Sequence, residues 1–107
     1  MNFFADNLEY WTQNQVETLL FANAEKHLTL LISSTPDAAG HYLEWNDQSQ
    51  ATYNTVEKVN LSPQELQVQL LPEAEKTIGE TTFTVSFEAE PAVFQEITSR
   101  LKTIFGE

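Results

Sequence analysis

The chain has 107 residues, of which 41% are hydrophobic, and it contains no cysteine. This is enough apolar material for one core and too little for two, so we expect a single domain over residues 1–107. Sixteen acidic residues against five basic ones give a formal net charge of −11. That charge repels phosphate backbones and anionic lipid, which argues against nucleic-acid and membrane partners, and the lack of cysteine excludes disulfides and thiolate zinc sites.

The acidic residues are spread along the chain, with a net charge of −6 over residues 1–60 and −5 over residues 61–107. The start, Met1–Asp6, lacks the basic and apolar regions of a secretory signal. The longest apolar run, Leu30–Ile32, is too short to span a bilayer. We therefore expect a cytoplasmic protein.

The first third of the chain predicts strands. Phe3 and Phe4 indicate a short first strand, and Leu8 to Trp11 continue it after a turn at Asp6–Asn7. Val16–Ala22 and His27–Ser33 are the next two strand candidates, separated by a four-residue loop. The run Ser33–Gly40 that follows is rich in turn-forming residues, and we expect it to be the most mobile segment.

Residues 41–53 read as a β-hairpin. Tyr42, Leu43 and Trp45 favour a half-buried strand, and residues 52–56 resume that character after a polar stretch, Asn46–Gln50. No Asn-Gly or Asp-Gly pair is present, so the pattern favours a loop longer than two residues.

The next segment contains a choice between helix and strand. Ser62, Pro63 and Glu65 could begin a helix as a capping box, but Leu66, Val68 and Leu70 alternate strictly with polar residues, which favours a strand. Residues 72–79 then fit a short helix, with proline at its start and glycine after its end. Thr82–Glu88 alternates again and predicts the clearest strand of the sequence.

The C-terminus predicts an amphipathic helix that opens at Pro91 and stops at Gly106. Its apolar residues fall on one stripe, and Glu96 and Arg100 are spaced to pair on another. An amphipathic helix after several alternating strands should cover one face of a sheet. The expected fold is therefore α+β: an antiparallel sheet of about six to seven strands with a C-terminal helix packed on one face.

Catalytic and metal-binding patterns are weak. His41, Glu44 and Asp47 would converge on a helix, but on a strand His41 and Glu44 point to opposite faces, so we expect no metal site. No nucleophile elbow or glycine-rich phosphate loop is present. We expect neither an enzyme nor a cofactor, with a small hydrolase using clustered carboxylates as the least favoured alternative.

The aromatic residues near polar ones, Trp11, Tyr42, Trp45 and Tyr53, have two readings. Tryptophan and tyrosine are common anchors of protein interfaces. They are also highly buried on average, so Trp45 and Tyr42 are alternatively members of the sheet core.

Several segments together resemble the bacterial immunity proteins of family ten. The resemblance rests on Gly40–Gln48, then Tyr53 and Val56, Leu61 with the alternating Leu66–Leu70, the alternating Phe83–Phe87, and Leu101, Ile104 and Phe105. Members of this group protect a bacterium from a polymorphic toxin secreted by itself or its kin. The resemblance implies a non-enzymatic, cytoplasmic inhibitor that binds a cognate toxin domain, and it supplies no catalytic residues.

Two partner hypotheses follow. Nuclease toxins are often basic, and an acidic inhibitor would be steered toward one. We then expect contacts from Glu44, Asp47 and Gln48 in the hairpin, with Trp45 as an anchor. The alternative is an assembly module that is acidic only for solubility and dimerises through a sheet edge. The sequence thus leaves monomer and homodimer open.

Overall fold

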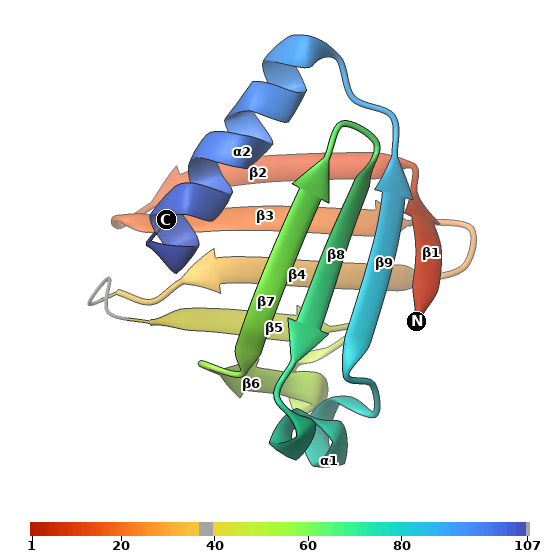
Figure 1. Cartoon of the computed structure of the whole chain (residues 1–107), viewed down its shortest axis with the longest axis vertical. Coiled ribbons are helices and arrows are strands. Elements are labelled where there is room, and N and C mark those ends of the chain that lie inside the picture. Colours follow the sequence, from red (N-terminus) through yellow and green to blue (C-terminus); the bar gives the residue numbers. More distant parts are fainter. Residues whose placement is uncertain (37–39, 107) are drawn as a thin grey trace.

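The computed structural model describes residues 1–36 and 40–106, and these residues form two stacked layers (Figure 1). One layer is a five-stranded antiparallel sheet in the order β2-β3-β4-β5-β6, and the other contains a four-stranded sheet in the order β1-β9-β8-β7. Within the described residues the strands are β1 (Asn2–Ala5), β2 (Asn7–Gln13), β3 (Val16–Asn23), β4 (Leu28–Ser34), β5 (His41–Trp45), β6 (Ala51–Tyr53), β7 (Val56–Ser62), β8 (Glu65–Leu70) and β9 (Thr82–Phe87).

The strands of the two sheets cross at a steep angle in Figure 1, and the long helix α2 (Pro91–Phe105) lies beside β7 in the same layer as the four-stranded sheet. A 3-10 turn, η1 (Gln48–Gln50), precedes β6. A second turn, η2 (Pro72–Ala74), leads into the short helix α1 (Glu75–Ile78). No helix in the described part of the chain is long and apolar enough to cross a membrane.

The core lies between the two layers. The inward side chains of β8 and β9 alternate with outward polar ones, so that Val68 and Phe83 are at most 2% exposed. From the opposite sheet, Phe21 packs against Phe87 with 6.0 Å between ring centroids. Burial of these apolar side chains is the main favourable contribution to folding.

Helix α2 covers the part of the five-stranded sheet that the four-stranded sheet leaves open, where it contacts β3 and β4. Its buried stripe is Ile97, Leu101 and Ile104. Gly106 ends the helix with φ +74°, a left-handed conformation that glycine adopts without a steric penalty. The predicted helix and its Glu96–Arg100 pair, 3.2 Å apart, are confirmed.

The predicted α+β class is confirmed, and the structure adds detail to the strand count. Nine strands in two sheets take the place of the expected six to seven in one, counted over residues 1–36 and 40–106. The difference arises at Asn54, whose left-handed φ of +58° ends β6 and sends Val56 into the other sheet as the start of β7. The strand at residues 65–70 and the short helix before Gly79 are confirmed. The centre of the loop expected to be mobile, residues 37–39, lies outside the described residues.

Candidate partner-binding surface

The four residues expected to contact a partner occupy three different environments. Glu44 lies on β5 and points away from the core, while Trp45, the next residue, points into it. Asp47 and Gln48 lie in the loop between β5 and β6 and are exposed. The hairpin is therefore confirmed as a structure, but its predicted contact residues do not form one cluster.

Trp45 is only 4% exposed, which is incompatible with the expected role as a surface anchor. Its ring packs against Phe83 and Phe3, with centroids 4.9 and 5.7 Å away. The expectation fails because strand side chains alternate, and Trp45 shares the inward face with Leu43. Trp45 thus joins the two sheets, as the alternative reading of its sequence context proposed.

Asp47 orders the loop in which it lies. Its carboxylate caps η1 by accepting hydrogen bonds from the Ser49 backbone N–H at 2.8 Å and from the Ser49 hydroxyl. These bonds hold the pKa of the Asp47 carboxyl below its usual range. At the other end of η1, the Gln50 side chain donates to the Ile78 carbonyl in α1 at 3.3 Å. The loop is therefore anchored, and its negative charge has a fixed position.

The solvent-facing side of the five-stranded sheet, which we call the outer face, presents several aromatic side chains. Strand register places residues of five strands in rows across it. One row is Trp11, Thr18, Ser33, Tyr42 and Tyr53. The adjacent row is Glu9, Leu20, Leu31, Glu44 and Ala51.

The aromatic residues of the outer face are partly or largely exposed, with Trp11 at 38% and Tyr53 at 64%. Tyr42 and Tyr53 face each other across β5 and β6 with ring centroids 5.0 Å apart. The Tyr42 hydroxyl donates to Glu44 at 2.6 Å. Burial first, and then the hydrogen bond and charge of Glu44, raise the pKa of Tyr42 to about 12. The Tyr42 side chain is thus oriented by its hydrogen bond to Glu44 and by its contact with the Tyr53 ring.

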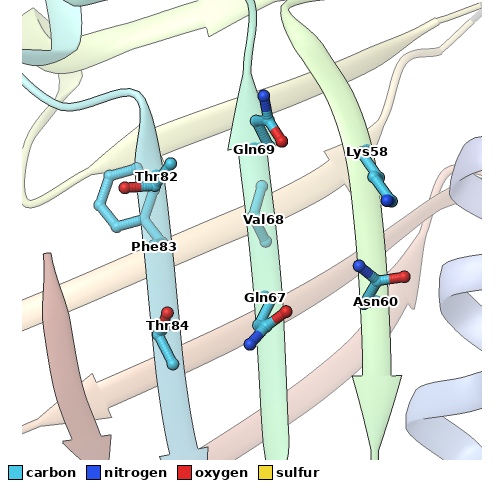
Figure 2. A pocket seen from close by; sticks show the side chains of 8 residues that line it. All are labelled: Lys58, Asn60, Gln67, Val68, Gln69, Thr82, Phe83 and Thr84. Atoms are coloured by element: carbon cyan, nitrogen blue, oxygen red, sulfur yellow. The ribbon is translucent and has the colours of Figure 1, made fainter.

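Each sheet carries a hollow on its solvent side. On the outer face, a hollow of about 430 Å³ is lined by residues that include Trp11, Val16 and Thr18. The four-stranded sheet carries one of about 270 Å³ on its own solvent side (Figure 2). Figure 2 shows that amide and hydroxyl groups from three strands surround it: Asn60, Gln67, Gln69, Thr82 and Thr84, with Lys58 at the edge. The two sheets therefore present chemically different surfaces.

His41 occupies a structural position. Its Nε2 accepts the backbone N–H of Val56 at 3.0 Å, and its ring lies 4.9 Å from that of Phe105. Burial lowers the pKa of His41, so the imidazole is held neutral as an acceptor. As expected for a strand, His41 and Glu44 lie on opposite faces. Among residues 1–36 and 40–106, no three histidine, cysteine or carboxylate side chains gather into a metal-binding group.

The outer face presents exposed tryptophan and tyrosine side chains beside carboxylates. Surfaces of this composition commonly bind other proteins. A family model described as Immunity protein 10 matches residues 13–95. The match spans well over half of the chain, so the chain belongs to this family. No curated protein and no solved structure matches it. Membership implies that the partner is a toxin protein, which the chain neutralises, and the family is generally non-enzymatic.

Sequence reasoning singled out Trp11 and Tyr53 only as aromatics near polar residues, and it did not place Leu20 and Leu31 beside them. The available signal was that Leu20 and Leu31 both break the alternation of their strands by adding an apolar residue to the polar side. Apolar residues on both faces fit the central positions of β3 and β4 in the five-stranded sheet.

Proposed function

We propose that the chain binds a single cognate toxin domain in the cytoplasm, one to one, and neutralises it without chemistry of its own. Family membership over residues 13–95 carries this proposal. The net charge of −11 favours a toxin with a basic surface, such as a nuclease domain, because opposite charges accelerate the encounter of two proteins.

Within this proposal, Glu44, Asp47 and Gln48 remain the charged and polar contacts. Glu44 is fixed by Tyr42, and Asp47 is fixed as the cap of η1, so both carboxylates are presented with little conformational freedom to lose. Ordering side chains opposes association, and positions that are already fixed reduce that cost. Trp45 is not part of the proposed contact surface, because it is buried.

The proposal is tested by purifying the tagged chain from its own host and identifying retained proteins at low and high salt. One basic toxin domain, held at near-equal stoichiometry and weakened by salt, is the expected result. Recovery of only the chain itself, from a host shown to express the toxin, would refute the proposal and favour the homodimeric assembly module.

A further inference from the structure

We infer that the outer face of the five-stranded sheet, centred on the rows through Trp11, Leu20, Leu31 and Tyr53, is the surface on which the basic toxin domain docks. The inference rests on the proposed function and deepens it by naming the interface. Helix α2 and the four-stranded sheet both pack on the opposite side of the five-stranded sheet (Figure 1). On the outer face itself, Trp11 and Tyr53 are exposed to solvent.

The side chains of this face have the composition of an interface centre. Trp11 stands on β2 at one side, and the Tyr42–Tyr53 pair stands on β5 and β6 at the other. Between them lie Thr18 and Ser33, whose small side chains are buried, at 6% and 7% exposed. In the next row lie half-buried Leu20 and Leu31. Four strand spacings separate Trp11 from Tyr53, a width of roughly 19 Å that suits one partner domain.

The charges of the outer face indicate which kind of partner it binds. Glu9 and Glu44 flank Leu20 and Leu31 on either side. The described strand residues of the outer face include no lysine or arginine. A partner with apolar side chains at its centre and lysine or arginine at its rim would match this arrangement, since charge complementarity selects partners and fixes their register. A second copy of this chain would bring a like-charged surface, because each copy carries a net charge of −11.

The four-stranded sheet offers the appropriate comparison. Its solvent side is built of amides and hydroxyls (Figure 2) and carries the exposed aromatic Phe4, 44% exposed, on β1. Phe4 lies on the strand face opposite to buried Phe3 and pairs in register with Ser86. It is therefore an aromatic residue of similar exposure on the other sheet, and its replacement is a matched control.

The test compares Trp11→Ala with Tyr53→Ser, singly and combined, against Phe4→Ala. The probe is the toxin domain captured from the host, produced as a pure protein, and its dissociation constant is measured for each variant. Truncation of central tryptophan and tyrosine anchors commonly weakens an interface at least tenfold. We expect the double variant to lose at least tenfold in affinity, mostly through faster dissociation, and Phe4→Ala to bind like the unmodified chain.

Thermal unfolding of each variant separates lost contacts from lost folding, and Tyr53→Ser removes a side chain that is already 64% exposed. Equal affinity of all variants for the toxin domain would overturn the outer face as the interface while leaving the proposed function intact. A larger loss in Phe4→Ala would move the interface to the four-stranded sheet. Dimers that sediment without toxin and dissociate in the double variant would assign the face to a second copy instead. Failure of the unmodified chain to bind would refute the proposed function itself.

Discussion

The guanidinium of Arg100 on α2 donates to the carboxylate of Glu17 on β3 at 2.6 Å, and this ion pair joins the C-terminal helix to the five-stranded sheet. Arg100 also donates to the Thr12 hydroxyl at 3.0 Å and lies 4.8 Å from the centre of the Tyr10 ring. Both charged side chains are partly buried, at 15% and 24% exposed. The contact fixes how the helix crosses the sheet on the face opposite to the proposed interface.

Replacing Arg100 with methionine should therefore lower the free energy of unfolding by about 2 kcal/mol, because the partly buried Glu17 carboxylate loses its charged donor. Methionine keeps much of the aliphatic packing. The control is Glu96→Gln, which removes the more exposed i,i+4 partner of Arg100 and should cost about 0.5 kcal/mol or less. Urea unfolding measures both. Equal losses of unfolding free energy in the two variants would show that the Arg100–Glu17 pair stabilises the fold no more than the Arg100–Glu96 pair does.

The lowered pKa of His41 leads us to expect that the stability of the fold depends on pH. Its pKa in the folded chain lies below the ordinary value of 6.5, so the unfolded chain binds a proton more readily. Stability from this group is therefore present above about pH 6.5 and is lost as the pH falls toward the lowered folded pKa. Protonation would also remove the acceptor for the Val56 N–H.

The variant that tests this is His41→Gln, whose amide oxygen can accept the same N–H without titrating in this range. Its free energy of unfolding should fall less than that of the unmodified chain between pH 7.5 and about 5.5. His27→Gln replaces an exposed histidine in the turn before β4 and serves as the control. Parallel pH profiles for all three proteins would contradict the assignment to His41.

Electrostatic steering is tested by neutralising Glu44 and Asp47 together, as Glu44→Gln with Asp47→Asn. Both replacements keep the shape of the side chain, and asparagine still caps η1. Association with the toxin domain should slow about threefold to tenfold at low salt and depend less on salt. Glu88→Gln with Glu90→Gln, at exposed positions before α2, changes the net charge equally and is the control. Identical slowing in both pairs would assign the effect to net charge instead of to these two positions.

Trp45 should act on stability and not directly on binding. Trp45→Ala would empty a site between the two sheets and cost about 3–5 kcal/mol, while Trp45→Phe should cost less, because it keeps a ring against Phe83. The folded fraction of Trp45→Phe should bind the toxin domain with unchanged affinity. A loss of affinity in Trp45→Phe at unchanged folded fraction would indicate that Trp45 does contact the toxin domain.

Local pattern predicted the elements well, and pairing between distant segments accounts for what it did not predict. The alternation of Phe83, Val85 and Phe87 correctly gave both the strand and its inward face. Strand side chains that are two residues apart share a face. The same alternation, applied to Leu43 and Trp45, would have placed the tryptophan in the core. By contrast, the parallel pairing of β1 with β9 joins residues about 80 positions apart, and the turn at Asn54 depends on its bonds with His41, including one from the His41 N–H at 3.0 Å. Neither leaves a periodic signal in the sequence.

The toxin activity that remains when increasing amounts of the chain are added tests the central claim most directly. Neutralisation by stoichiometric binding predicts a linear loss of activity that ends at one chain per toxin domain, with the Trp11→Ala and Tyr53→Ser double variant requiring an excess. Full toxin activity at a several-fold excess of the folded, unmodified chain would contradict the account.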